Sequence, residues 1–240
     1  MINESGTPSM ENQQTSKIKL FLTFMLYLIF PVALLAISGN WLWPEGWIFS
    51  IWFLGLCYLI IIYLYRYSPA LLAERYRLPG SGGERRWDKY FLYILFTSFV
   101  LWFVIMPLDA QRFAWTTNFP VWLEPLGLLL LMGSAFFMLR SYKDNAFLSP
   151  LVRVQSERDQ KVVSTGVYGF VRHPLYLGAM LLFLGAPLLL GSLYGFIIGA
   201  YLCVLFVGRI MGEEKMLLEE LEGYKAYTKK VEYRLIPYIW

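Results

Sequence analysis

Long runs of apolar residues, separated by polar segments, dominate the chain. They cover residues 19–38, 47–65, 90–107, 122–140 and 175–208. A helix needs roughly 20 apolar residues to cross a bilayer, so each of the first four runs predicts one membrane-spanning helix. The fifth run is too long for one crossing, and Gly191-Ser192 near its middle predicts two helices in a tight hairpin. The pattern therefore predicts an all-α, polytopic membrane bundle with about six crossings.

The Lys and Arg residues gather in alternate polar segments. If the N-terminus is cytoplasmic, the inner segments are 1–18, 66–89, 140–174 and 209–240. With Lys19 at the first boundary, these segments hold all but one of the 21 Lys and Arg residues, the exception being Arg112. Cytoplasmic loops of membrane proteins carry an excess of basic residues. The distribution therefore predicts an even number of crossings, with both termini on the cytoplasmic side.

The composition narrows the classes of partner and site. The chain is 58% hydrophobic and 16% charged, and its formal charge of +4 is accounted for by the inner loops. We expect membrane lipids as partners and no nucleic acid, because no basic stripe with interleaved aromatic residues is present. One histidine and two separated cysteines, Cys57 and Cys203, give no metal-ligand spacing, so we expect no metal site.

The polar and apolar segments suggest three parts. Residues 1–16 are polar and are expected to form a disordered tail, residues 17–140 a scaffold of about four crossings, and residues 141–240 the functional core. The glycine-rich loop 78–87 follows no strand and lacks a Gly-x-Gly-x-x-Gly pattern, so we expect a flexible loop there. Asp109 and Arg112 lie in a predicted outer loop and receive no role.

The second half of the chain has more sequence features that indicate ordered structure outside the apolar runs than the first half has. The polar loop 140–174 has regularly spaced apolar positions, which indicates order, and Pro174 is well placed in the first turn of the next helix. Apolar residues between Met216 and Tyr227 recur at helical spacing. The last crossing is thus predicted to continue as an amphipathic cytoplasmic helix that Gly223 breaks. Residues 231–237 are expected to be extended, because the residue before Pro237 avoids the helical conformation.

Polar residues at the ends of membrane helices are functional candidates by default. The sole histidine, His173, and Tyr176 stand at the start of one helix, and Arg209 and Glu213 stand in the last crossing. Each also has a structural explanation. His173 could cap its helix, Tyr176 could anchor at the interface, Arg209 could mark the membrane boundary, and Glu213 could belong to a solvated face.

Several motifs, in one order along residues 150–240, resemble a known family. Gln155-Ser-Glu, Val162-Val-Ser-Thr-Gly-Val-Tyr168 and Arg172-His-Pro-Leu-Tyr-Leu-Gly178 resemble the cofactor-binding core of isoprenylcysteine carboxyl methyltransferases. Arg209, Glu213-Glu214 and the tail residues Tyr224, Tyr227 and Pro237 extend the likeness. The superfamily also includes phospholipid methyltransferases. The first half of the chain is similar to these proteins only as a set of membrane helices.

The resemblance implies that S-adenosylmethionine binds at the cytoplasmic face, between the 150–174 loop and the tail, and that a lipophilic acceptor enters from the bilayer. The loop and the amphipathic tail helix would form the cofactor pocket. The implied cofactor-binding residues are Gln155, Gln160, Lys161, Val162, Val163, Tyr168, His173, Pro174, Leu175, Tyr176 and Glu213. The family usually has a histidine where this chain has Gln160, a change of little consequence if the backbone makes the contact. Gln155 could instead be an ordinary loop residue.

The residue types suit methyl transfer. Aromatic faces attract a sulfonium cation, and a carboxylate such as Glu213 can accept hydrogen bonds from hydroxyl or amino groups. The resemblance places Arg209, with His173, at the catalytic centre, and the planar fork of Arg209 could bind an acceptor carboxylate. Such a carboxylate is already nucleophilic at neutral pH. An amine or thiol acceptor would need deprotonation, for which His173 or Glu214 would be weak candidates.

Other functions stay open from the sequence. Methylation of a phospholipid amine or a small thiol would use the same fold, and fold does not decide the acceptor. An NADPH-dependent sterol-type reductase is the main alternative, because such enzymes are similar in the Arg172-His-Pro run and in the tail Tyr233-Arg-Leu-Ile-Pro237. The Arg209 and Glu213-Glu214 arrangement argues against it. A channel or transporter would show polar residues at mid-membrane, and the first-half helices lack them.

Overall fold

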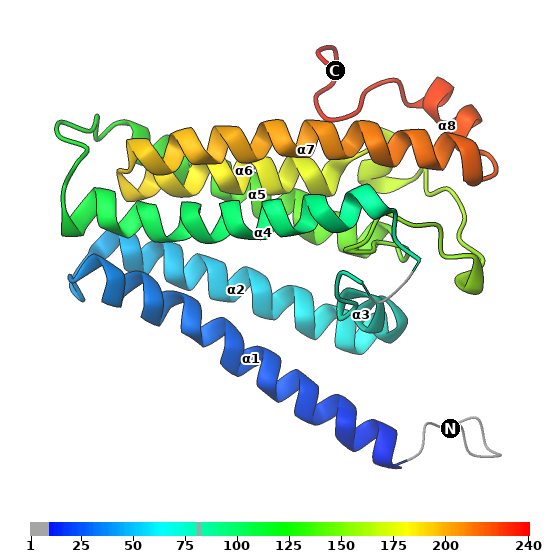
Figure 1. Cartoon of the computed structure of the whole chain (residues 1–240), viewed down its shortest axis with the longest axis horizontal. Helices are drawn as coiled ribbons and strands as arrows, with labels where there is room; N and C mark the ends of the chain where they lie inside the picture. The colour runs from blue at the N-terminus through cyan, green and yellow to red at the C-terminus, as the bar shows by residue number, and fades with distance from the viewer. Residues whose placement is uncertain (1–9, 81–82) are drawn as a thin grey trace.

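The computed structural model describes residues 10–80 and 83–240, and in these ranges the chain is helical with connecting loops and no strand. Figure 1 shows the helices as a bundle with nearly parallel axes. The main helices are α1 (Met10–Ser38), α2 (Pro44–Tyr67), α3 (Pro69–Arg75), α4 (Arg86–Pro107), α5 (Leu123–Asp144), α6 (Pro174–Leu190), α7 (Leu193–Glu220) and α8 (Tyr224–Lys230). Short turns of helix are η1 (Leu108–Arg112), η2 (Ser156–Arg158) and η3 (Gly166–Gly169).

The helix lengths confirm the predicted polytopic membrane bundle. Among the described residues, α1, α2, α4, α5 and α7 are each long and apolar enough to cross a membrane, and α6 is apolar but has only 17 residues. At 1.5 Å per residue, α6 is about 25 Å long. The predicted hairpin is also present. Gly191 adopts a left-handed conformation with φ of 75°, and the Ser192 hydroxyl caps α7 by accepting a hydrogen bond from Gly195 N at 2.9 Å.

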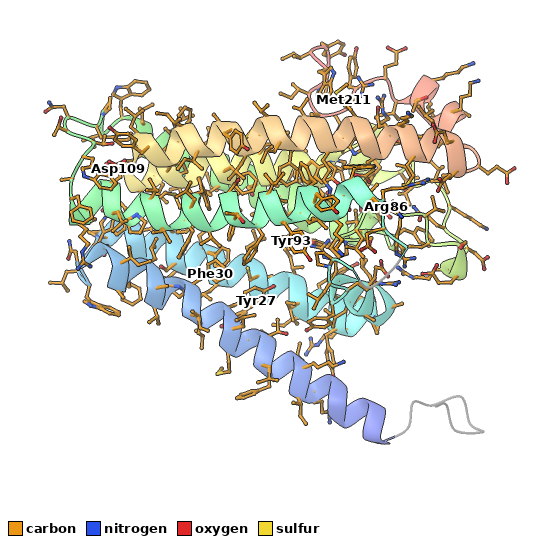
Figure 2. The ribbon with its side chains drawn as sticks, viewed as in Figure 1. Tyr27, Phe30, Arg86, Tyr93, Asp109 and Met211 are labelled. Atoms are coloured by element: carbon orange, nitrogen blue, oxygen red, sulfur yellow. The ribbon has the colours of Figure 1, made fainter. Side chains whose placement is uncertain are left out.

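The two ends of the bundle differ. We call the end with the Gly191-Ser192 turn the hairpin end, and the end with α3, the 145–173 loop and α8 the tail end. Asp109 lies at the hairpin end and Arg86 lies near the tail end (Figure 2). In Figure 1, α1 lies close to α2 at the hairpin end and diverges from it towards the N-terminus.

Two segments differ from the sequence predictions. Residues 10–16 of the expected disordered tail belong to α1, because the glutamate and glutamines there favour the helix that the apolar run continues. Residues 1–9 of that tail lie outside the described residues. Helix α3 was not predicted. It forms where Ser68 ends α2 and Pro69, in the first turn, starts a new helix with a preset φ angle.

Close packing around α6 relies on glycine. A Cβ atom at Gly127 of α5 would lie 2.4 Å from the backbone nitrogen of Leu189, and one at Gly185 would lie 2.9 Å from the carbonyl oxygen of Gly127. Small residues let membrane helices approach in this way. Most of the side chains of α6 are buried between its neighbours. Helix α6 is therefore the centre of the bundle.

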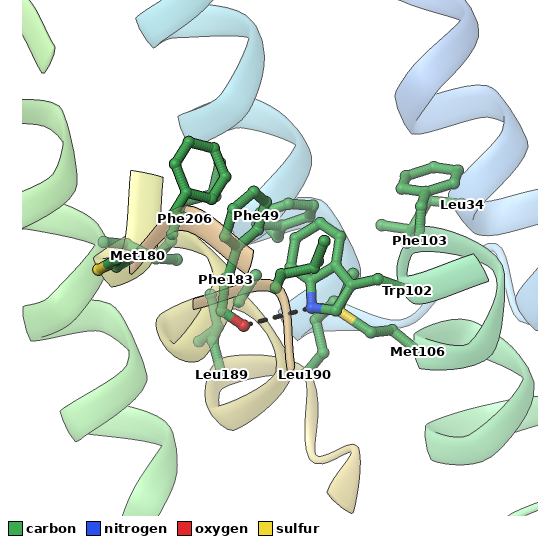
Figure 3. Close-up of a cluster of buried hydrophobic side chains, with 14 of the residues drawn as sticks. Leu34, Phe49, Trp102, Phe103, Met106, Met180, Phe183, Leu189, Leu190 and Phe206 are labelled. Atoms are coloured by element: carbon green, nitrogen blue, oxygen red, sulfur yellow. Dashed lines mark hydrogen bonds between the residues drawn. The ribbon is translucent and has the colours of Figure 1, made fainter. Parts of the chain in front are cut away.

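A cluster of aromatic and aliphatic side chains fills the interior of the bundle and extends from Trp43 to Ile210 (Figure 3). Trp102 and Phe183 meet edge to face with ring centroids 5.4 Å apart, and the Trp102 indole N–H donates to the Phe183 carbonyl oxygen at 3.2 Å. Phe103 and Phe49 belong to the same cluster. Two of its members, Leu182 and Phe206, also line a cavity that extends towards the tail end.

The predicted amphipathic tail is confirmed in its main features. Helix α7 continues past the apolar run to Glu220, and Gly223, with φ of 82°, separates it from α8. The segment after α8 lies against the start of α6, where Arg172 N donates to Tyr233 O at 3.0 Å and His173 N donates to Arg234 O at 2.9 Å. These two hydrogen bonds tie the tail to the motif around the sole histidine.

Candidate functional site

A single large cavity collects nearly all of the residues singled out in the sequence. It has a volume of about 690 Å³ and lies between the helices at the tail end, within the usual range of roughly 300–1,000 Å³ for ligand sites. The predicted site residues that line it are Gln160, Lys161, Val162, Val163, Tyr168, His173, Leu175, Tyr176, Arg209 and Glu213. Residues from the loop, α6 and α7 thus converge on one space.

The polar part of the cavity is built on the first turn of α6. His173 is the N-cap residue of this helix and Tyr176 follows three positions later, so both rings lie on one face and stack with centroids 5.6 Å apart. The Tyr176 hydroxyl donates to Glu213 Oε2 at 2.5 Å. This contact joins α6 to α7 and fixes the Glu213 carboxylate at the cavity wall.

Glu214 holds the neighbouring segments together from behind the cavity. Its Oε1 accepts from Arg172 Nε at 2.6 Å and lies 3.2 Å from His173 Nε2, while its Oε2 accepts from Arg234 Nε at 2.7 Å. The side chain is buried and does not line the cavity. Because its oxygens are engaged by three cationic or polar groups, Glu214 orients His173 and is not placed to act as a base towards an acceptor.

Arg209 is paired inside the protein, which changes the role predicted for it. Its Nε and Nη2 donate to the two carboxylate oxygens of Asp88 at 3.0 and 3.2 Å, and Nη2 also donates to Pro150 O at 2.6 Å. The fork that the sequence assigned to an acceptor carboxylate is therefore already occupied. Within the described residues Nη1 makes no hydrogen bond, so it is the donor that remains for a ligand.

Two of the implied cofactor-binding residues, Gln155 and Pro174, do not line the cavity. Gln155 is fully buried but does not line the cavity. Its amide donates to Phe147 O and accepts from Arg158 Nη1, so its hydrogen-bonding groups are used to shape the loop. Pro174 is buried in the first turn of α6 and also does not reach the cavity surface.

Tyr168 lines the cavity, but its hydroxyl is buried away from it. Its hydroxyl is buried without a well-formed hydrogen bond in the described part of the chain, although Ser141 and Asn145 lie beside it. Burial raises the pKa of Tyr168 above its ordinary value, so the hydroxyl keeps its proton and remains a donor. The part of Tyr168 that the cavity can offer to a ligand is therefore its ring and not its hydroxyl.

Charged residues anchor the loop that carries the motifs. Arg153 donates through Nε and Nη2 to Glu74 of α3 at 3.0 and 2.8 Å, and through Nη2 to Glu157 at 2.5 Å. Burial alone would raise the pKa of Glu74, but its hydrogen bonds from Arg153 and Ser149 lower the pKa overall. The hydrogen bond from Arg153 is the main cause that lowers the pKa of Glu157 to about 2. This ion-pair cluster fixes the loop to the first half of the chain.

The cavity continues away from its polar residues as an apolar limb. We define the limb by the side chains of α2 that line it, which are Trp52, Phe53, Leu56, Cys57, Ile60, Ile61 and Leu64. The first half of the chain, expected to be scaffold only, thus contributes a wall of the site. It also contributes Asp88, which the sequence analysis missed. Its one signal was an acidic residue in the first turn of an apolar helix, within a basic segment.

The second half of the chain matches a known family. Residues 123–223 match the phospholipid methyltransferase family. The protein-S-isoprenylcysteine O-methyltransferase of Saccharomyces cerevisiae is 34% identical over 106 residues, which cover 43% of this chain and 44% of that protein. Its counterpart in Schizosaccharomyces pombe is 34% identical over 85 residues, or 35% of this chain and 36% of that protein. The resemblance to the isoprenylcysteine carboxyl methyltransferase family is therefore confirmed.

A second group of relatives is also similar. The mouse delta(14)-sterol reductase TM7SF2 is 27% identical over 136 residues, which cover 49% of this chain and 32% of that protein. This likeness agrees with the similarity to sterol-type reductases noted at Arg172-His-Pro and in the tail. The chain spans less than half the length of the curated relatives it matches.

Proposed function

We propose that this integral membrane protein is a methyltransferase that moves a methyl group from S-adenosylmethionine to a lipophilic acceptor, with the carboxylate of an isoprenylcysteine-like compound as the candidate substrate. One observation carries the proposal. Motif residues from the loop, from α6 and from α7 line one cavity whose polar part, around His173, Tyr176 and Glu213, continues into an apolar limb. A charged cofactor requires a polar environment and a lipophilic acceptor requires an apolar one, and methyl transfer requires the two to be adjacent.

The residues present fit the cofactor. Glu213 offers an acceptor at the cavity wall, and the faces of Tyr168 and Tyr176 can attract a cationic sulfonium. His173, at the N-terminus of α6, supports a negatively charged group. When bound, S-adenosylmethionine supplies an electrophilic methyl group. The protein has to position the acceptor against it and exclude water, and positioning of this kind is worth several kcal/mol, about 7–11 at most.

Arg209 orients the acceptor in this proposal. Asp88 holds its Nε and Nη2, and its guanidinium lies over the rings of Phe91 and Tyr176, with distances of 5.6 and 5.8 Å to the centroids. The group is thereby rigid, and Nη1 can donate to an acceptor carboxylate. A carboxylate is nucleophilic without loss of a proton, so no general base is required.

The proposed site lies on the cytoplasmic side of the membrane. Both termini, the 145–173 loop and most Lys and Arg residues would share that side, in agreement with the positive-inside rule. The acceptor would enter from the bilayer. Methylation of a phospholipid amine or a small thiol uses the same donor site, and an acceptor screen separates these substrates.

Calorimetric titration of the detergent-solubilised protein with S-adenosylhomocysteine tests the donor site. We expect saturable binding to the wild type, weaker binding to Glu213→Gln, and loss of binding in His173→Ala. Glu219→Gln, an exposed substitution on the same helix as Glu213, is the matched control and should bind as the wild type does. Unchanged affinity in Glu213→Gln would remove this residue from the site.

Arg209→Ala tests the acceptor half of the proposal. We expect it to bind S-adenosylhomocysteine but to lose turnover with carboxylate acceptors. Because the substitution also leaves Asp88 unpaired, the folded fraction is checked by thermal melting, and Arg209→Lys, which retains a charge near Asp88, serves as a second variant. Turnover equal to that of the wild type in both variants would contradict the proposal that Arg209 orients the acceptor.

An NADPH-dependent reductase is the second candidate. The 27% identity to the mouse sterol reductase favours it, together with the ordered tail against Arg172 and His173. Thermal stabilisation separates the two functions. Stabilisation by S-adenosylhomocysteine supports the methyltransferase, whereas stabilisation by NADPH alone would replace it with the reductase.

A further inference from the structure

The apolar limb runs along α2. Trp52, Leu56, Ile60 and Leu64 are spaced four residues apart, so successive side chains are neighbours in one row that winds gradually around the helix. Twelve residues separate the first from the last, which corresponds to about 18 Å along the helix axis. The limb is therefore a long extension of the site, deep enough to hold a hydrocarbon tail.

The limb has a closed end. At its last turn on α2, Phe49 stacks on Trp52 with ring centroids 6.1 Å apart, and Phe30 of α1 packs on Phe53 at 4.9 Å. Behind these rings lies the buried cluster of Figure 3, to which Phe49 belongs. Protein interiors of this kind are close-packed and have low compressibility. A tail that reaches Trp52 and Phe53 is therefore blocked sterically by these rings. We call these two residues the aromatic floor.

We propose that the aromatic floor sets the length of the hydrocarbon tail that the site accepts. This inference rests on the proposed function, and it names the acceptor as a compound with a polar head near Arg209 and Glu213 and a single linear tail along α2. Each tail atom that enters the limb gains about 25 cal/mol per Å² of buried apolar surface. A tail longer than the limb must displace packed rings or leave the protein, and that gain then stops.

Two leucines on α2 provide a matched pair of variants. Leu56 lines the limb and is 6% exposed, whereas Leu59 lies on another face of the same helix and is 57% exposed. Leu56→Trp fills the limb one turn before the floor and shortens it by about 6 Å. Leu59→Trp adds the same side chain on an outward face, where the limb is unaffected.

The experiment compares kcat/KM for N-acetylcysteine thioethers that carry geranyl, farnesyl or geranylgeranyl tails. In Leu56→Trp we expect the ratio of the longest to the shortest tail to fall at least about tenfold relative to wild type, the size of effect that a single methylene can have in a tight pocket. In Leu59→Trp the ratio should equal that of wild type. An unchanged ratio in Leu56→Trp, or an equal loss for all tails, would overturn the inference.

A variant of opposite sign adds a second test. Phe53→Ala removes part of the floor, so we expect its preference to move towards the longer tail. Leu56→Phe, a smaller change, replaces Leu56→Trp if the latter melts before assay. A preference in Phe53→Ala that moves towards shorter tails, or does not move, would count against the floor.

Failure of the proposed function is distinguishable from failure of this inference. If the wild type methylates none of the thioethers, the methyltransferase proposal fails for this acceptor class. The limb is then tested by calorimetric binding of the same compounds, where Kd should depend on tail length in wild type and lose that dependence in Leu56→Trp. No binding, or binding independent of tail length, would overturn the inference by itself.

Discussion

The hairpin end and the tail end of the bundle bury carboxylates in opposite ways. At the hairpin end, the fully buried Asp109 accepts hydrogen bonds from neutral groups, and its described partners include Thr116 N at 2.8 Å, Ser192 Oγ at 2.7 Å and Tyr194 N at 3.2 Å. At the tail end, Asp88 and Glu214 are held by arginines. The first arrangement joins the loop after α4 to the α6–α7 hairpin, and the second surrounds a cavity.

The difference shows which end is built for packing and which for a ligand. Neutral donors satisfy Asp109 completely, and glycines bring α5 and α6 into close contact nearby. At the tail end, arginine–carboxylate pairs stand beside apolar clusters such as Met216, Leu217 and Tyr227, and the cavity lies between these elements. Buried ion pairs contribute little net stability in general, but breaking one is expensive. Four variants test this contrast, and they are ordered here by the size of their expected effect.

The largest effect is expected at Glu214. Its removal in Glu214→Ala leaves Arg172 and Arg234 without their shared partner and frees the imidazole of His173. Loss of one member of a buried pair costs about 3–5 kcal/mol. Thermal melting in detergent should show the largest drop of the series, and S-adenosylhomocysteine binding should be lost. Glu219→Ala on the same helix is exposed and should melt as the wild type does. Equal melting of the two variants would contradict the central role of Glu214.

The next effect is expected at Gly127. In Gly127→Val the new Cβ would lie 2.4 Å from Leu189 N and 2.7 Å from Gly185 O, both backbone atoms that cannot rotate away. Overpacking of this kind costs about 3 kcal/mol. The folded fraction should still bind S-adenosylhomocysteine, because the contact lies at the hairpin end. Gly55→Ala is the control, since no atom lies within 4 Å of its added Cβ. A stable Gly127→Val protein would show that the helices can separate there.

A smaller effect is expected at Asp109. Asp109→Asn preserves the shape but replaces one acceptor oxygen with an amide that faces donors, at a cost of about 1–2 kcal/mol. Thermal melting should detect this loss, while the affinity for S-adenosylhomocysteine and the turnover of folded protein should not change. A change in affinity would mean that the two ends are coupled, contrary to the comparison drawn above.

The smallest effect is expected at the surface of the tail end, and it depends on pH. The pKa of Glu157 is lowered from 4.5 to about 2, chiefly by its hydrogen bond from Arg153. Because the pKa of Glu157 is lower in the folded state than in the unfolded state, its ionised carboxylate stabilises the fold. This contribution is fully present above pH 4.5 and is lost as the pH falls through about 2. Since the Glu157 side chain is 53% exposed, Glu157→Gln should cost only a few tenths of a kcal/mol, about 0.5 at most, at neutral pH.

Melting of wild type and Glu157→Gln, compared at neutral pH and at about pH 2, measures this contribution. The two melting temperatures should differ slightly at neutral pH and converge in acid. A difference that grows as the pH falls would reverse the sign of the argument, and Glu157 would then be destabilised by its surroundings.

The sequence predicted those parts of the molecule that depend on local pattern. Apolar runs located the membrane helices, and the Gly191-Ser192 step located the hairpin, because turn residues interrupt a run whatever surrounds it. His173 and Tyr176, one helical turn apart, could be expected to share a face. The motif order along the chain then allowed the loop, α6 and α7 to be assigned to one site.

The features that the sequence did not predict depend on contacts between residues that are far apart in the chain. Asp88 and Arg209 are separated by 121 residues, and no local pattern links them. Gln155 has the chemistry of a ligand-binding residue, but only the fold shows that its amide turns towards Phe147 and Arg158. The aromatic floor could not be predicted for the same reason. Trp52 and Phe53 belong to an apolar run, and the sequence does not show which residues of that run face lipid and which face the cavity.

The central position of α6 also bears on how the protein meets bilayers of different thickness. At about 25 Å this helix is shorter than a hydrocarbon core of roughly 30 Å. None of its residues is exposed, however, so α6 meets protein and not lipid along its length. Adaptation falls to α1, which is largely exposed and diverges from its neighbours (Figure 1). A thinner or thicker membrane should therefore tilt α1 and leave the donor site, which is built on α6, unchanged.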